Sequence, residues 1–143
     1  MRLLICLLSL WVGLAQATEV IREQGFEVQV QPFPSTFLTP KVASTYGFER
    51  SRRQALLNVV ALKIQPDGSA RGAVPATVTG FVKNLLGQTQ TLSFREIDEG
   101  EGAIYYLAPV RVTNQETIQI VLEVTPADSR PIEVDFRHQV YVD

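Results

Sequence analysis

Few side chains in this 143-residue chain could do acid–base or metal chemistry. The only histidine is His138, and the alternation that begins at Ile132 places it on the apolar side of a predicted strand, near the strand's end. A lone histidine lacks the partner set of an active site, so we favour a half-buried side chain at the rim of a core. The only cysteine, Cys6, falls in a segment that we expect to be removed. The composition therefore argues against a transition-metal site and against a cysteine nucleophile, and we predict no catalytic or metal-binding residues.

The carboxylates offer a second chemistry, because four of them crowd one predicted turn between Asp98 and Gly102 and the strand before it: Glu96, Asp98, Glu99 and Glu101. Oxygen ligands on a flexible turn could bind calcium, although their spacing matches no EF-hand loop. We favour a solvated hairpin tip whose charges keep strand edges from pairing with other chains. A calcium-stabilised structural domain stays open as one alternative. An envelope-acting hydrolase that uses carboxylates or His138 is the other.

A basic cluster with neighbouring aromatic residues is the third candidate. Arginine side chains suit carboxylate or phosphate groups, and aromatic rings could form the floor of a binding site. The competing interpretation is that the rings plug one end of the fold while the arginines face solvent. The candidate binding residues are Phe37, Tyr46, Phe48, Arg50, Arg52 and Arg53, and Phe33 lies just before them.

Period-two alternation of apolar and polar residues governs most of the chain and predicts strands. The residues from 56 to 64 are apolar on both faces, which predicts a central, covered strand, and Pro109 indicates an edge or a bulge. The pattern favours an all-β fold, a single β-sandwich of immunoglobulin-like character with about seven strands, over a small barrel. The predicted strands are 26–31, 56–64, 74–82, 91–97, 103–112, 117–124 and 132–137.

One short helix is expected near residues 40–46. Thr39 can cap it, Pro40 suits the first helical position, and Gly47 can adopt the left-handed conformation that ends a helix. About two turns of helix are not stable alone, so the helix must pack on a sheet.

The first seventeen residues have the layout of a cleaved secretory signal: Arg2, an apolar run from Leu3 to Leu14, and small residues at Ala15 and Ala17. We therefore expect a single domain over residues 18–143, exported to the bacterial periplasm, with no membrane span after cleavage. Removing Arg2 changes the formal charge from −2 to −3. This mildly acidic balance argues against a nucleic-acid partner.

Several stretches of the chain are similar to one bacterial family. The segments STFLTP, NLLGQ, AIYYLAP and EVDFRHQVYV carry the resemblance to domain-of-unknown-function family 4426. The resemblance covers nearly the whole chain after the signal and implies a short, exported, proteobacterial protein with one β-rich domain. The family has no assigned activity, so no residue role is carried over.

Together these patterns predict a non-catalytic binding or assembly module in the cell envelope. It would contact a protein partner through a sheet edge or through the segment from 33 to 53, and it would use no cofactor. The sequence specifies neither the ligand nor the oligomeric state.

Overall fold

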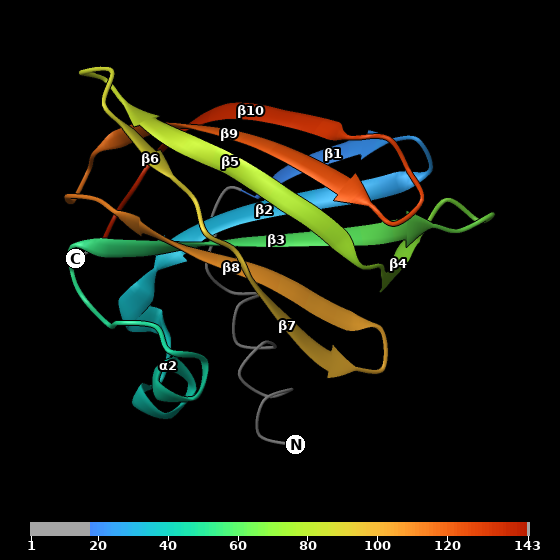
Figure 1. Cartoon of the computed structure of the whole chain (residues 1–143), viewed down its shortest axis with the longest axis horizontal. Coiled ribbons are helices and arrows are strands. Elements are labelled where there is room, and N and C mark those ends of the chain that lie inside the picture. Colours follow the sequence, from blue (N-terminus) through green and yellow to red (C-terminus); the bar gives the residue numbers. More distant parts are fainter. Residues whose placement is uncertain (1–17, 143) are drawn as a thin grey trace.

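The computed structural model describes residues 18–142 as two antiparallel sheets packed face to face (Figure 1). The predicted all-β sandwich is confirmed. The first sheet has the order β1-β2-β3-β8-β7, with β4 paired to the end of β3, and the second has the order β10-β9-β5-β6. The first sheet comprises β1 (Glu19–Glu23), β2 (Phe26–Pro34), β3 (Gln54–Ile64), β4 (Ala70–Ala73), β7 (Arg95–Gly100) and β8 (Ala103–Arg111). The second comprises β5 (Ala76–Asn84), β6 (Thr89–Thr91), β9 (Thr117–Pro126) and β10 (Ile132–Gln139).

The main core lies between the sheets and is built by the predicted alternation. In β9, Ile118, Ile120, Leu122 and Val124 are buried, and Ile132 and Val134 of β10 join them. The expected inward face of β8 is also buried; its residues are Ile104, Tyr106, Ala108 and Val110, followed by Val112. Burial of apolar side chains on one face of each strand therefore fixes which side of every strand faces solvent.

Residues 18–142 form ten strands where the sequence predicted seven, and each difference has a local reason. The predicted strand 91–97 is two strands in different sheets, because Leu92 and Phe94 pack into the main core where the chain crosses over. The acidic turn is also shorter than predicted, since β7 continues to Gly100. The remaining two strands, β1 and β4, are short edge strands of mixed polarity, for which alternation is a weak signal.

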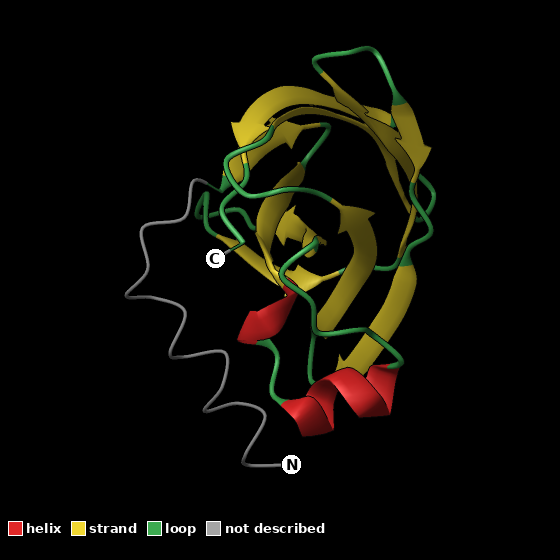
Figure 2. Cartoon of the chain, turned by 90° about the vertical axis from the view of Figure 1, so that its left-hand side faces the viewer, coloured by secondary structure: helices red, strands yellow, loops and turns green. Residues whose placement is uncertain are grey.

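The central strand β3 is covered on both sides as predicted, with Leu56 and Leu57 fully buried on opposite faces. On the outer face, Leu56 joins a second core cluster formed with Phe33, Leu38, Ala43, Ile97 and Leu107. A short 3-10 helix, η2 (Ser35–Phe37), and the helix α2 (Pro40–Tyr46) lie on this outer side, below the sheets in Figure 2.

Helix α2 begins and ends where the sequence predicts. The Thr39 hydroxyl accepts a hydrogen bond from Val42 N at 3.2 Å, and Pro40 occupies the first turn. Gly47 adopts φ 76°, and its N–H donates to the carbonyl groups of the last helical turn. The helix buries Ala43 against the second core cluster, which supplies the packing that two turns of helix require.

Pro109 occupies an open edge, although β8 is an internal strand. Strand β7 pairs with β8 only as far as Leu107, so the half of β8 that follows has no strand on that side. The backbone N–H and C=O of Arg111 point to this open side, where both bond to the side-chain amide of Gln90. The direction of the backbone N–H and C=O groups alternates along a strand, so the nitrogen of Pro109 points to the same open side as that of Arg111. The missing N–H of Pro109 therefore removes no hydrogen bond between strands.

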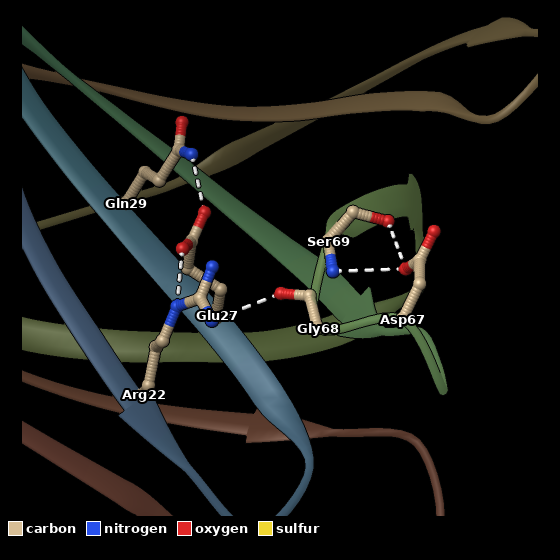
Figure 3. A network of polar contacts seen from close by, with 6 residues as sticks. All are labelled: Arg22, Glu27, Gln29, Asp67, Gly68 and Ser69. Atoms are coloured by element: carbon tan, nitrogen blue, oxygen red, sulfur yellow. Dashed lines mark hydrogen bonds and ion pairs between the residues drawn. The ribbon is translucent and has the colours of Figure 1, made fainter.

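A buried carboxylate ties the first hairpin together. Glu27 is nearly buried and accepts hydrogen bonds from Gln29 Nε2 at 2.7 Å and from Arg22 Nε at 2.8 Å (Figure 3). Arg22 also donates to the carbonyl of Gly68 at 3.1 Å, which links β1 to the turn after β3. The Gln29 hydrogen bond, with the bond and charge of Arg22, lowers the pKa of Glu27 although burial opposes the shift.

Glu27→Gln should therefore change how stability depends on pH. A carboxylate whose pKa is lower in the folded state stabilises the fold above its unfolded pKa, and loses this contribution as pH falls through the folded pKa. At pH 7 we expect a loss of about 1 kcal/mol in the free energy of unfolding. The difference from the wild type should shrink as pH falls below the ordinary carboxyl pKa and through the lower folded pKa of Glu27. Urea unfolding at pH 7 and pH 3 measures it, with Glu133→Gln, an exposed position on β10, as the charge-matched control. An equal deficit at both pH values would contradict this role.

Candidate functional site

The aromatic residues proposed from the sequence mainly pack the helix onto the sheet. Tyr46 and Phe48 border the second core cluster, whereas Phe37 remains 40% exposed. The guanidinium group of Arg95, on β7, lies 5.6 Å from the ring centre of Phe48 and donates to the Tyr46 carbonyl. A cation at the last carbonyls of α2 also complements the helix dipole. Tyr46 and Phe48 thus agree with the interpretation that the rings close one end of the fold, rather than with the interpretation that they form the floor of a binding site.

The three candidate arginines are separated by the structure. Arg50 donates through Nε to the Leu38 carbonyl at 2.7 Å and through Nη2 to the Thr36 carbonyl at 3.3 Å, so it holds the segment around η2. Arg52 is exposed in the turn before β3. Arg53 alone lines a cleft between the two sheets. The structure therefore does not form the continuous cationic rim that the sequence pattern suggested.

The cleft opens at the end of the sandwich from which the β5–β6 turn projects. That turn lies at the upper left of Figure 1. The cleft has a volume of about 520 Å³. Three buried apolar side chains, Val82, Val112 and Ile118, lie at its base. Polar side chains form most of the remaining wall; they are Arg53, Asn84, Gln88, Thr89, Gln90, Arg111, Thr113 and Glu116.

Two cations, Arg53 and Arg111, line this cleft. The backbone carbonyl of Arg53, in the turn just before β3, accepts a hydrogen bond from Val112 N, just after β8, at 2.9 Å. Arg53 therefore lies beside Val112 in the cleft wall, where it is exposed to solvent. Among residues 18–142 its guanidinium group has no hydrogen-bond or ion-pair partner.

Hydrogen bonds hold the polar wall in place. Gln90 joins the sheets, because its Nε2 donates to the Arg111 carbonyl at 2.7 Å and its Oε1 accepts from Arg111 N at 2.9 Å. Asn84 Nδ2 donates to Gln88 Oε1 at 2.8 Å, and Glu116 accepts from the backbone and hydroxyl of Thr113. A site with pre-set polar groups over an apolar base is suited to binding, since little side-chain ordering remains to be done.

His138 lies where the sequence predicts, half-buried on the inward side of β10 opposite Ile118. Burial lowers the pKa of this imidazole below its ordinary value. Within residues 18–142 it makes no hydrogen bond or ion pair with a carboxylate. The geometry thus gives His138 no acid–base partner among these residues.

The four acidic residues do not gather into one site. Glu96 lies in register with Tyr106 and accepts a hydrogen bond from the Tyr106 hydroxyl at 2.7 Å. Asp98 accepts a hydrogen bond from Gly100 N at 2.9 Å. Glu99 falls on the opposite face of β7, where Tyr46 donates to it at 3.4 Å. In the described part of the chain, no three His, Cys, Asp or Glu side chains lie close enough to hold a metal ion.

The cleft itself was not predicted, because it joins residues from both sheets. Gln90 and Glu116 are ordinary polar residues in the sequence, and only the packing of β6 beside the end of β8 brings them to one site. The single usable signal was Arg53, which the basic cluster contained. No helix in residues 18–142 has the length and hydropathy needed to cross a membrane.

Comparisons with known proteins agree with the fold. The family model described as "Domain of unknown function (DUF4426)" matches residues 22–143. A crystal structure of a DUF4426 family protein from Pseudomonas aeruginosa PAO1 is 33% identical with a TM-score of 0.75, over 88% of this chain and 96% of that one. A search of the curated proteins found no match.

More distant structures share the fold alone. FetP of uropathogenic E. coli strain F11, recombinantly expressed in the periplasm, is 12% identical with a TM-score of 0.64, over 90% of this chain and 98% of that one. A copper-bound variant of FetP is 12% identical with a TM-score of 0.63, over 87% and 95% of the two chains. The match over residues 22–143 and the 33% identical relative establish that this chain belongs to the domain-of-unknown-function family 4426.

Proposed function

We propose that this protein is an exported, non-catalytic binding module whose cleft between the sheets receives a segment of a protein partner in the cell envelope. The observation that carries the proposal is the unpartnered guanidinium group of Arg53 at a cleft with an apolar base. The signal-like segment 1–17, which supports export, lies outside the described residues.

The cleft favours a partner segment that carries an acidic side chain or a carboxylate terminus. Arg53 can bind a carboxylate through paired N–H groups, while the buried Val82, Val112 and Ile118 make the base of the cleft apolar. The proposed site thus includes one end of the segment 33–53 that the sequence analysis singled out, and it does not include the aromatic rings.

The strand edges are weaker candidates for the same role. Strand β7 carries several charges and β6 has only three residues. The open half-edge of β8 lacks one donor at Pro109 and is occupied by Gln90 at Arg111. Strand β10 is the longest free edge, but Glu133, Asp135 and Arg137 alternate along its solvent face. Charged and interrupted edges disfavour the addition of another strand.

A catalytic role is not supported by the same geometry. The one histidine has no carboxylate partner in residues 18–142, and the carboxylates of β7 are divided between two faces. A general acid or base must lie within hydrogen-bond reach of the proton that it transfers, usually in a site that also orients it. The geometry therefore favours a binding role over a hydrolase.

Copper, which the FetP variant binds, does not fit the residues present here. Copper sites in proteins are built mainly on imidazole, thioether and thiolate ligands. The whole chain has one histidine, one methionine and one cysteine, and Met1 and Cys6 lie outside the described residues. His138 is then the single such ligand in residues 18–142. The proposed function accordingly contains no metal.

Site-specific photocrosslinking tests the proposal. Gln88 is replaced by p-benzoylphenylalanine in the full chain, expressed in its own host and irradiated. We expect a discrete protein adduct, and we expect Arg53→Glu to lower its yield roughly fivefold or more because the charge that pairs with the partner is reversed. The same photoreactive residue at Arg130, at the opposite end, and the charge change Arg130→Glu serve as controls. A cleft probe that gives no adduct, or an adduct indifferent to Arg53→Glu, would refute the proposal.

A further inference from the structure

Leu85 and Leu86 are the most exposed large apolar residues in the described chain, at 73% and 85% of their full surface. They occupy the two central positions of the turn that joins β5 to β6, where Gly87 N donates back to the Asn84 carbonyl at 3.0 Å. Such positions usually hold Pro, Asp, Asn, Ser or Gly. Two leucines there expose apolar surface that the fold itself does not use.

The turn presents these leucines in a fixed geometry. Asn84 Oδ1 accepts hydrogen bonds from Leu86 N at 3.0 Å and from Gln88 N at 2.9 Å. Gly87 has φ 82°, the left-handed conformation that closes this type of turn. The exposure of the leucines thus follows from a hydrogen-bonded turn, and ordering them on a partner costs little conformational entropy.

Two cations stand at the foot of the same turn. Lys83 and Arg137 both align with Gln119, one from each side of β9, so all three side chains lie on the solvent face of the second sheet. The Lys83 side chain also runs along the turn, with its Cε 3.9 Å from where a Cβ on Gly87 would lie. Neither cation has a hydrogen-bond or ion-pair partner within residues 18–142.

The charge on this face reverses away from the turn. Along the solvent face of β10, moving away from the turn, the side chain after Arg137 is that of Asp135. The next one is Glu133, which lies opposite Glu123 of β9. The two cations therefore lie at the leucine end of this face and the carboxylates lie further along it, the nearest being Asp135, which accepts a hydrogen bond from Gln119 Nε2 at 2.8 Å. Such a charge distribution orients the leucine turn toward an anionic surface.

We propose that the leucine turn, defined as Lys83 to Gly87 with Arg137, docks on an anionic lipid bilayer. Leu85 and Leu86 enter the boundary between headgroups and acyl chains, and Lys83 and Arg137 contact lipid phosphates. An apolar insertion combined with basic residues is the pair of signals that holds peripheral proteins on membranes. Two side chains on a narrow turn offer far less than the roughly 800 Å² per partner of a stable protein interface, so a bilayer suits them better.

This inference goes beyond the proposed cleft function and does not depend on it. Leu85, Leu86, Lys83 and Arg137 are not among the residues that line the cleft. The two sites lie at the same end of the sandwich, because Asn84 and Gln88 border both the cleft and the turn. A protein docked through its leucine turn would hold the cleft mouth close to the bilayer.

Vesicle cosedimentation tests the proposal, using purified protein without residues 1–17. Vesicles of phosphatidylglycerol with phosphatidylethanolamine should bind the protein, and phosphatidylcholine vesicles should bind it much more weakly. Lys83→Gln with Arg137→Gln should lower the partition coefficient on anionic vesicles roughly 25-fold, taking about fivefold for each basic residue. Leu85→Ser with Leu86→Ser should lower it on the same vesicles by roughly tenfold. Lys63→Gln with Arg130→Gln, away from the turn, is the charge-matched control and should leave binding unchanged.

A fluorescence measurement separates insertion from simple adsorption. The only tryptophan of the chain is Trp11, in the predicted signal, so Leu86→Trp creates a single reporter in the protein without residues 1–17. Its emission should shift to the blue on anionic vesicles and stay unchanged with phosphatidylcholine. Equal binding to both kinds of vesicle, or binding that survives the double serine variant, would overturn the proposal. So would a photocrosslinker at Leu86 that captures a protein while anionic vesicles bind nothing. The cleft experiment at Gln88 is unaffected by either outcome, so the two proposals fail separately.

Discussion

Gly80→Ala should destabilise the protein by about 3 kcal/mol or more, the largest effect expected from a single methyl group here. Gly80 lies in the middle of β5, in register with Leu122 of β9. A Cβ at this position would overlap the carbonyl oxygen of Val121 and lie 2.9 Å from Leu122 Cα. These are backbone atoms of a paired central strand, so they cannot move aside without breaking ladder hydrogen bonds. The carbonyl of Gly80 also accepts the hydrogen bond from Leu92 N that fixes the crossing between the sheets.

Urea unfolding of Gly80→Ala beside Gly68→Ala measures this effect. Gly68 has φ 85° in an exposed turn with nothing within 4 Å of an added Cβ. Its substitution should cost only about 1 kcal/mol, the ordinary penalty of a left-handed non-glycine residue. Equal stability of Gly80→Ala and Gly68→Ala would contradict the close contact between the backbones of β5 and β9 at Gly80.

Ser35→Ala should cost about 2 kcal/mol in the free energy of unfolding and should loosen the segment that carries η2 and α2. Ser35 is fully buried, and its hydroxyl donates to the Ser51 carbonyl at 2.8 Å while accepting from Ser51 N at 2.9 Å. These two bonds close the segment that contains η2, α2 and Arg50. Alanine would leave the Ser51 N–H without a partner in a partly buried place, which is the costly way to lose a hydrogen bond.

Urea unfolding together with hydrogen exchange checks this second effect. Amides of α2 should exchange faster in Ser35→Ala than in the wild type, while the amides of β9 should remain the more strongly protected. Ser44→Ala, on the exposed side of α2, is the matched control and should change stability by less than about 0.5 kcal/mol. Normal exchange in α2 with unchanged stability would show that the Ser35–Ser51 pair does not hold the segment.

Local signals predicted α2 to the residue, because a capping threonine, a first-turn proline and a left-handed glycine act within one short stretch of chain. Alternation likewise predicted the buried faces of β8, β9 and β10, since a strand with one wet face repeats every two residues. The predicted position of His138 at the rim of the core follows from the same rule.

The crossing at Leu92 was missed for the opposite reason. A chain that leaves one sheet for the other keeps an apolar, alternating pattern, because both sheets face the same core. The site was missed in the same way. The sequence placed Arg50, Arg52 and Arg53 in one cluster. In the structure, Arg50 donates to the Leu38 carbonyl, Arg52 faces solvent and Arg53 lines the cleft.

The sequence by itself determined the fold class, the helix and the inward face of the main strands, since these depend on neighbours one to four residues away. Only the tertiary structure decided which strands share a sheet, that Gly80 must lack a side chain, and that Arg53, Gln90 and Glu116 border one cleft. These features depend on contacts between residues far apart in the chain, and local side-chain chemistry carries no record of such contacts.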